Sequence, residues 1–312
     1  DHNQLMMETM KTLALRHGFV CLLGEKPFDG INGSGKHNNW SASTNTGVGL
    51  FDPGKEPYEN TRFLLFLAAM IKAVDEYQDL LRISVASASN DRRLGGHEAP
   101  PAILSIFLGE ELTDIIDSII TGKRYSGIKK TKMETGVNTL PEFARDNTDR
   151  NRTSPFAFTG NKFEFRMPGA SQSIADPNIV LNTIMAESLS QFADKLEKKS
   201  EDIEASMRRL IKETFKKHRR ILFNGNGYDD KWIAEAEKRG LSNLAATPDA
   251  MPSFISDKSI SLFTSHKVYT ERELRSRYEI FLEAYCKIIH IEAKTMLEMT
   301  IRDIIPAVSK YI

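Results

Sequence analysis

The segment NKFEFRM, residues 161–167, decides the fold that we expect for this 312-residue chain. Apolar and charged side chains alternate along it, so a β-strand here places its apolar side chains on one face. The preceding residues PFAFTGN alternate in the same way and end in the turn pair Thr159–Gly160. We therefore predict a β-hairpin. Its apolar face carries Phe156, Phe158, Phe163, Phe165 and Met167.

The other face of the second strand carries a carboxylate between two cations. These residues are Lys162, Glu164 and Arg166. Two interpretations are open at this point. Such a row is typical of a solvated surface strand. Alternatively, the carboxylate holds a metal ion, and anionic oxygens bind around it.

The composition excludes several classes of partner. The chain has 42 Lys plus Arg and 42 Asp plus Glu, so no net field favours nucleic acid or an anionic membrane. The longest strongly apolar run, residues 63–71, is too short to span a bilayer as a helix. Cys21 and Cys286 show no metal-ligand spacing, and we expect reduced thiols in a cytoplasmic protein. The chain begins at Asp1 and enters an amphipathic helix directly, so we expect a piece of a longer polypeptide.

Periodicity and capping signals outline the remaining elements. Predicted strands are a buried one at 19–23 and a short one at 103–108. Irregular loops are expected at 90–101 and 123–150. Predicted helices are a first one that ends at Gly18, then 59–81, 112–121, one that Asp176 and Pro177 begin, a charged one after 199, 231–239, and a long one from a Thr270–Glu273 capping box to about Ile304.

Three polar segments could carry chemistry, and each also has an ordinary structural interpretation. Residues 24–41, GEKPFDGINGSGKHNNWS, let backbone amides approach a ligand, but they lack P-loop spacing, and a lone histidine such as His37 is more often structural than a ligand. The composition of residues 90–101, NDRRLGGHEAPP, favours a solvated loop. The basic run 216–220, KKHRR, is typical of a solvated helix end and lacks the interleaved aromatics of nucleic-acid sites.

Four segments taken together resemble the catalytic domain of glutamine synthetases. They are GEKPFDGINGSGKHNNWS, RRLGGHEAPPA, NRTSPFAF and KFEFRMPGAS. KHNNWS, GGHEAPPA and FTGNKFEFRMP are most similar to the large type III bacterial enzymes. The resemblance implies a C-terminal portion of the catalytic domain over 1–197 and a helical extension over 198–312. It also implies an α+β fold, a curved and mostly antiparallel sheet with ligands on its inner face and helices outside.

The resemblance implies a reaction as well. ATP phosphorylates the side-chain carboxylate of glutamate, and ammonia then displaces phosphate to give glutamine. Mg²⁺ or Mn²⁺ is the expected metal cofactor. The expected assembly is a homo-oligomer, a dodecamer of stacked hexameric rings.

Site residues are carried over position by position from the family motifs. The implied metal ligands are His37 and Glu164. The implied substrate contacts are Asn32, Gly33, Arg166 and Arg93, with Arg92 as the alternative to Arg93 because the loop is shorter here. The implied nucleotide contacts are Ser41, Arg152 and Lys162. Glu98 is implied to close over the site and deprotonate ammonium, and Arg152 to contact the transferring phosphate.

Two departures and one gap leave alternatives open. Asn39 stands where many family members have a second histidine, and Ala157 lies where an arginine is often found. The family's further metal-binding glutamates come from strands that precede this segment, so we expect the 312-residue chain alone to be inactive. One alternative is a structural or regulatory subunit, which would not bind Mg²⁺ or Mn²⁺ through His37. The other is a ligase that joins glutamate to an amine other than ammonia.

Overall fold

The predicted hairpin forms in the computed structural model of the chain. The structure describes residues 2–24, 26, 28, 30–96, 99–123, 125, 154–198 and 202–312. Strands β3 (Phe156–Phe158) and β4 (Phe163–Phe165) pair antiparallel, with Ala157 opposite Glu164. The turn between them is closed by a hydrogen bond of 2.8 Å from the Thr159 N–H to the Lys162 carbonyl.

The hairpin is the centre of a small open sheet. Within the described residues, four strands follow the order β1-β4-β3-β2. Strand β1 (Asn38–Trp40) is antiparallel to β4, and β2 (Ile106–Phe107) is parallel to β3. The fold is therefore mixed α and β, as predicted. The curvature of the sheet stays a prediction.

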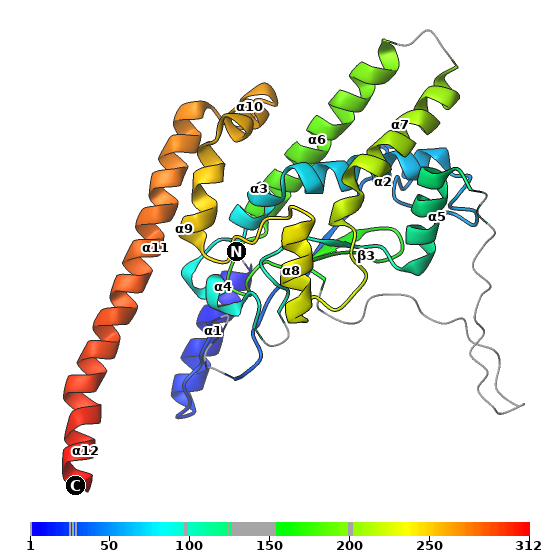
Figure 1. Ribbon diagram of the computed structural model, residues 1–312. Coiled ribbons are helices and arrows are strands. Elements are labelled where there is room, and N and C mark those ends of the chain that lie inside the picture. Colours follow the sequence, from blue (N-terminus) through cyan, green and yellow to red (C-terminus); the bar gives the residue numbers. More distant parts are fainter. Residues whose placement is uncertain are drawn as a thin grey trace, which may run out of the picture.

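Helices make up most of the described chain (Figure 1). The α-helices are α1 (His2–Arg16), α2 (Thr61–Glu76), α3 (Gln78–Ile83), α4 (Ala88–Arg93), α5 (Glu110–Thr121), α6 (Ala175–Glu197), α7 (Ile203–His218), α8 (Asp230–Lys238), α9 (Thr247–Ala250), α10 (Asp257–Ser265), α11 (Glu271–Met299) and α12 (Ile305–Tyr311). Short 3₁₀ turns cover Arg219–Ile221 and Met251–Ile255, and Thr300–Ile304 form a π-helical turn. No helix of the described residues is long and apolar enough to cross a membrane.

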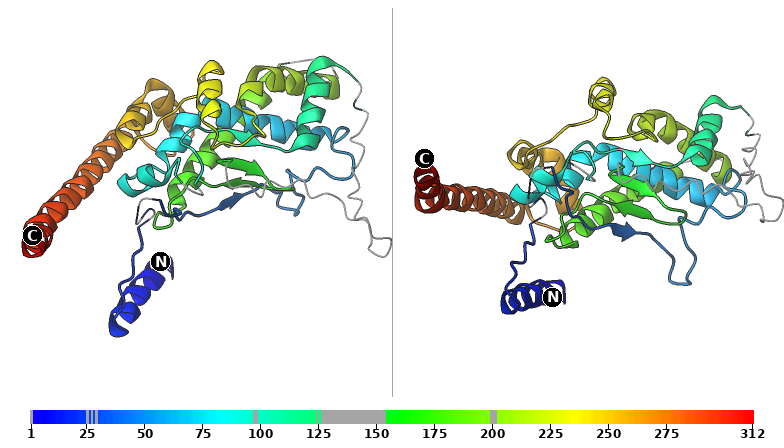
Figure 2. Two further views of the ribbon diagram at one scale, coloured as in Figure 1. Left: turned by 60° about the horizontal axis from the view of Figure 1, so that its bottom comes forward. Right: turned by 90° about the horizontal axis from the view of Figure 1, so that it is seen from below.

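The aromatic face of the sheet builds the core. Phe156 and Phe163 stack with their ring centroids 5.0 Å apart, and Phe158 packs against Phe63 of α2. These side chains are buried, and each contributes about 1.5–3 kcal/mol through loss of apolar surface from water. The main helical layer lies on this side of the strands (Figure 2). The alternation of the strands therefore directs their polar residues away from that layer.

The core continues without a break past residue 198. Helix α2 packs against both α6 and α7, and buried residues of the C-terminal region, among them Phe215 and Trp232, belong to the same apolar cluster. The proposed boundary at 197/198 stays a prediction. Helix α11 begins at the predicted capping box, in which the Glu273 N–H donates to Oγ1 of Thr270. It then extends away from the body (Figures 1 and 2).

Several predicted elements differ from the observed ones. Residues 19–23 are not a buried strand: Phe19 and Val20 are exposed, and no described strand pairs with them. The helix predicted over 59–81 breaks at Tyr77 into α2 and α3. Helix α6 begins at Ala175, so the predicted cap Asp176 lies inside its first turn.

The last helix also exceeds its predicted end. Helical structure continues past Pro306 to Tyr311. The π-helical turn at Thr300–Ile304 follows α11, and α12 follows it, with Pro306 in the first turn of α12. The helix is continuous through this point, so Pro306 removes one backbone hydrogen bond, and the π-helical turn lies just before it.

Candidate active site

Two residues far apart in the chain meet on the polar face of the sheet. The register of β1 and β4 places Asn39 opposite Glu164. His37 lies two residues before Asn39, so it projects toward the same face. Nδ1 of His37 is 3.5 Å from Oε2 of Glu164, and the two side chains are 43% and 20% exposed. The pair is therefore accessible to a ligand on this face.

Arg166 contacts the same carboxylate oxygen. Its Nε and Nη2 atoms each donate to Oε2 of Glu164 over 3.2 Å, and its side chain is only 4% exposed. The backbone N–H of Arg166 donates to the Pro155 carbonyl over 2.9 Å, which extends the β3–β4 pairing beyond the strand ends. The polar face thus carries an imidazole, a carboxylate and a guanidinium within contact distance. A guanidinium has five N–H donors, so one arginine can contact a carboxylate and a second anion together.

The imidazole and the carboxylate fit a divalent metal ion in chemistry and spacing. Mg²⁺ and Mn²⁺ accept carboxylate oxygens, and imidazole nitrogen is a common ligand of transition-metal ions. Two adjacent ligands at about 2.1 Å from one octahedral ion stand about 3.0 Å apart. The observed 3.5 Å between Nδ1 and Oε2 is close to that separation. Within the described residues no group of three or more His, Cys, Asp or Glu side chains comes together.

Helix α6 holds β1 in place from the opposite face. The Asn38 side-chain amide donates to Oδ1 of Asn178 over 3.0 Å, and Trp40 Nε1 donates to Oδ1 of Asn182 over 2.9 Å. Asn178 and Asn182 lie one helical turn apart, so one face of α6 contacts two alternate residues of β1. These bonds fix the orientation of β1 on either side of Asn39, and with it the position of His37.

A second buried arginine, Arg93, hydrogen-bonds the backbone that follows β4. Arg93 donates from Nη1 to the Met167 carbonyl over 2.9 Å and to the Pro168 carbonyl over 3.2 Å, and from Nη2 to the Arg166 carbonyl over 3.1 Å. The glycine-rich segment lies alongside, where Gly35 forms a β-bridge with Gly169. Gly35 also packs directly against the Arg93 guanidinium, so Arg93 contacts both the glycine-rich segment and the exit of β4.

The comparisons with known proteins agree with these features. Residues 206–312 match the family model described as "Glutamine synthetase C-terminal domain". The chain is 52% identical to a glutamine synthetase of Butyrivibrio fibrisolvens, over 100% of this chain and 44% of that protein. It is 48% identical to the type-3 glutamine synthetase of Dictyostelium discoideum, over 98% of this chain and 42% of that protein. The chain belongs to the glutamine synthetase family.

Another member agrees with this assignment. A glutamine synthetase of Bacteroides fragilis is 43% identical over 100% of this chain and 44% of its own length. The chain thus spans somewhat less than half the length of the glutamine synthetases that it matches.

The glutamine synthetase resemblance predicted a set of site residues, and the structure brings part of that set together. His37, Glu164 and Arg166 form one cluster. Ser41 lies beside the hairpin turn, where its hydroxyl donates to the Asn161 carbonyl over 2.8 Å, and Lys162 is half-buried next to it.

The remaining predicted residues lie elsewhere or beyond the described chain. Asn32 and Gly33 lie just before the bridge at Gly35, and Asn32 is exposed. Glu98 and Arg152 are outside the described residues. Arg93 is buried, and the backbone carbonyls that it contacts are those of residues 166–168. Arg92 is exposed and pairs with Glu292 of α11. The substrate role of either arginine stays a prediction.

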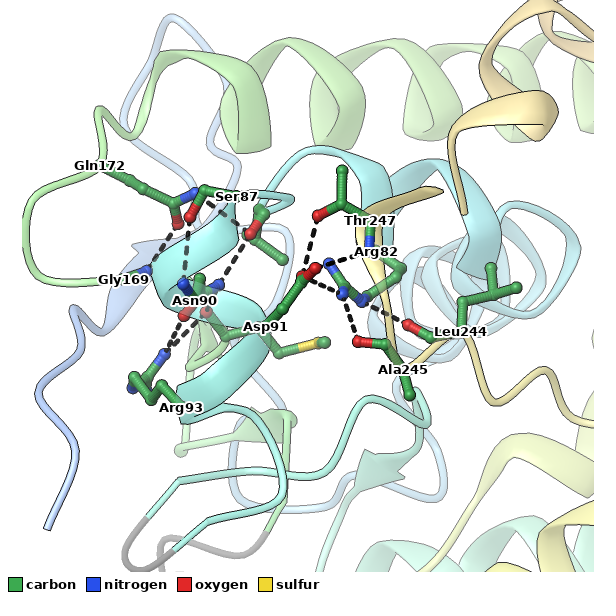
Figure 3. A network of polar contacts seen from close by, with 12 residues as sticks. Arg82, Ser87, Asn90, Asp91, Arg93, Gly169, Gln172, Leu244, Ala245 and Thr247 are labelled. Atoms are coloured by element: carbon green, nitrogen blue, oxygen red, sulfur yellow. Dashed lines mark hydrogen bonds and ion pairs between the residues drawn. The ribbon is translucent and has the colours of Figure 1, made fainter. Parts of the chain in front are cut away.

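The sequence pattern did not indicate the helix that carries Arg93. Helix α4 replaces the first part of the loop predicted at 90–101. Ser87 caps it by accepting from the Asn90 N–H over 3.2 Å. Figure 3 shows Asn90 and Arg93 on one side of α4 and Asp91 on the other. A Ser followed three residues later by a polar residue was the available signal, but α4 has no apolar periodicity to support it.

Proposed function

We propose that the protein containing this chain is an ATP-dependent ligase that joins ammonia to the γ-carboxylate of glutamate. An oxygen of that carboxylate attacks the γ-phosphorus of ATP, and ADP leaves with the bridging oxygen. The nitrogen of ammonia then attacks the acyl carbon of γ-glutamyl phosphate, and inorganic phosphate leaves. The observation that carries this proposal is the cluster of His37, Glu164 and Arg166 on the accessible face of the sheet.

His37 and Glu164 would hold one Mg²⁺ or Mn²⁺ ion. When bound, the ion would neutralise negative charge on the phosphate oxygens. Arg166 holds the Glu164 carboxylate in orientation, since both of its contacting nitrogens meet the same oxygen. Phosphoryl transfer needs little covalent help and depends on positioned positive charge. The cluster supplies that kind of environment.

The remaining groups have roles that follow from their chemistry. Arg166 and Arg93 or Arg92 would contact the glutamate substrate together with Asn32 and Gly33, because arginine suits carboxylates. Ser41, Lys162 and Arg152 would contact ATP. Glu98 would accept a proton from ammonium, and the ammonia so formed has the nitrogen lone pair that attacks the acyl carbon. Water must be excluded at this stage, because an acyl phosphate hydrolyses readily.

The family also supports a homo-oligomer in the cytoplasm, with stacked hexameric rings as the proposed assembly. Size-exclusion chromatography with light scattering on the full-length protein would measure its subunit number. A dodecamer is the expected result, and a monomer would contradict this part of the proposal.

The direct test is product formation by the full-length protein. Phosphate release and glutamine would be measured with ATP, glutamate, ammonium and Mg²⁺, for the wild type and for Glu164→Gln. We expect the substitution to lower kcat/KM by about 100-fold or more, since it removes a charge from the centre of the cluster. The exposed Glu111→Gln on α5 is the matched control. A wild type that forms γ-glutamyl amides only from alkylamines would indicate the amine ligase, and one without turnover would indicate a structural subunit.

A further inference from the structure

Helix α4 contacts the candidate active site on one side. Asn90 donates from Nδ2 to the Val85 carbonyl over 2.7 Å and to the Met167 carbonyl over 3.1 Å. Arg93 accompanies it on the same side and contacts Met167 and Pro168. Asn90 and Arg93 are three residues apart, and their side chains also bond to each other over 3.0 Å. This side of α4 therefore fixes the backbone that follows Glu164 and Arg166.

The other side of α4 contacts the C-terminal region through Asp91. Its Oδ2 accepts from the Thr247 N–H over 2.7 Å, and its Oδ1 accepts from the Thr247 hydroxyl over 2.8 Å. Arg82 pairs with Oδ1 over 2.7 Å, and this ion pair is buried, with side chains 1% and 11% exposed. Figure 3 shows these partners converging on the Asp91 carboxylate.

The same contact ties down the connector that leads into α9. Arg82 donates from Nε to the Leu244 carbonyl over 2.7 Å and from Nη2 to the Ala245 carbonyl over 2.9 Å. Arg82 and Asp91 thus bind Leu244, Ala245 and Thr247 of the segment 244–247. Buried hydrogen bonds to ionised groups are stronger than neutral ones, so this is a firm attachment.

Helix α4 is short enough to move as one body. It has six residues, and its own backbone bonds hold it together: the Asp91 N–H donates to the Ser87 carbonyl and the Leu94 N–H to the Asn90 carbonyl, both over 2.9 Å. A displacement at Asp91 must therefore reach Asn90 and Arg93. Through them it would reach residues 166–168.

We propose that Asp91 is a positioning residue, through which the C-terminal helical region sets α4 and the strand exit behind the His37–Glu164 pair. Its consequence for catalysis rests on the proposed function. Its structural part, the coupling of Thr247 to residues 166–168, does not depend on any activity. Asp91 contacts no residue of the His37–Glu164–Arg166 cluster directly in the described chain and acts on it through Asn90 and Arg93.

The exposed contact between α4 and the C-terminal region serves as a control. Arg92 pairs with Glu292 of α11, with side chains 52% and 39% exposed. Exposed ion pairs contribute little, because solvent screens them. The inference therefore assigns the coupling to Asp91 and predicts a small effect from Glu292.

The test compares Thr247→Val, Thr247→Ser and Glu292→Gln in the full-length protein. Thr247→Val removes only the hydroxyl that donates to Asp91 and keeps the size and the backbone bond. Amide hydrogen exchange should become about tenfold faster in residues 88–94 and 163–170, because one hydrogen bond to a charged group is lost. Thr247→Ser should restore the wild-type exchange, and Glu292→Gln should leave it unchanged. Faster exchange in Thr247→Val that stays within residues 240–260 would overturn the inference.

A second measurement reports on the site itself. Titration with Mn²⁺, followed by electron paramagnetic resonance, should show about twofold to thirtyfold weaker binding in Thr247→Val. If Thr247→Val shows faster exchange at 163–170 but unchanged Mn²⁺ affinity, then Asp91 does not position the His37–Glu164 pair. A wild type that binds no Mn²⁺ would contradict the proposed function, and the exchange measurement would then decide the structural coupling alone.

Discussion

Gly35 lies directly against the guanidinium of Arg93. A Cβ atom added to Gly35 would overlap the Nη2 and Cζ atoms of that arginine. The guanidinium cannot simply move away, because it is buried and its Nη atoms donate to the carbonyls of residues 166–168. The glycine is therefore required here by close approach.

Gly35→Ala is expected to destabilise the protein by about 2–4 kcal/mol, since it breaks a buried hydrogen-bond network. Urea unfolding followed by circular dichroism would measure the change. Gly24→Ala is the matched control, because no described residue lies within 4 Å of a Cβ at Gly24 and no positive φ restricts it. Equal unfolding midpoints for the two variants would show that the contact between Gly35 and Arg93 has no energetic weight.

The basic run KKHRR pairs with carboxylates of the core region. Oδ2 of Asp75 is 2.7 Å from Nδ1 of His218, and Oδ1 of Asp75 is 2.8 Å from Nε of Arg220. Asp75 is 2% exposed, so these partners take the place of water around its carboxylate. Asp75→Asn should lower the free energy of unfolding by about 3–5 kcal/mol, because it removes the carboxylate of a buried ion pair and leaves its cationic partners uncompensated.

The control for this prediction is Asp117, which pairs with Arg219 of the same run over 2.7 Å but is 48% exposed. Asp117→Asn should change the free energy of unfolding by less than about 1 kcal/mol. Thermal and urea unfolding of both variants would compare them. A larger loss in Asp117→Asn than in Asp75→Asn would contradict the structural interpretation of the run.

Glu76 gives a pH dependence with a definite sign. Burial raises the pKa of Glu76, but the hydrogen bond and charge of Lys72, together with the charges of His218 and Lys217, outweigh it, and the pKa falls below the ordinary 4.5. A carboxyl with a lowered folded-state pKa stabilises the fold at pH values above its unfolded pKa. That contribution is lost as the pH falls below about 4.5 and through the folded-state pKa.

Glu76→Gln should therefore reduce stability at pH 7 by about 2 kcal/mol, and the difference from the wild type should shrink as the pH falls below the ordinary carboxyl pKa. Urea unfolding at a series of pH values measures this difference. Glu283→Gln on α11 is the control, because Glu283 is exposed and pairs with the exposed Lys287 one helical turn away. A difference between wild type and Glu76→Gln that grows on acidification would reverse the predicted sign.

The hairpin was predictable because the sequence features that specify it lie within a few residues of one another. Alternation with period 2 and the turn at Thr159–Gly160 are visible within a few residues, and the structure confirms both strands. Helix α5 followed in the same way from its apolar stripe, and Gly122 ends it with a φ of +74°. The proximity of His37 and Glu164 was not local information. It came from the resemblance to a family.

Helix α4 shows why other elements were missed. Its residues ASNDRR are almost entirely polar, so periodicity gave no signal, and its stability comes from tertiary contacts of Asn90, Asp91 and Arg93. The reverse error occurred at residues 19–23, where an apolar run predicted a buried strand that no described strand pairs with. Apolar character alone cannot supply a pairing partner.

The central claim is that His37 and Glu164 share one divalent ion, and Mn²⁺ titration of the full-length protein tests it most directly. Electron paramagnetic resonance would count free Mn²⁺ for the wild type, His37→Ala, Glu164→Gln and the exposed control His17→Ala. We predict that both site variants weaken one Mn²⁺ site by about tenfold or more, equivalent to about 1.4 kcal/mol, while His17→Ala matches the wild type. Unchanged Mn²⁺ affinity in both His37→Ala and Glu164→Gln would contradict the account.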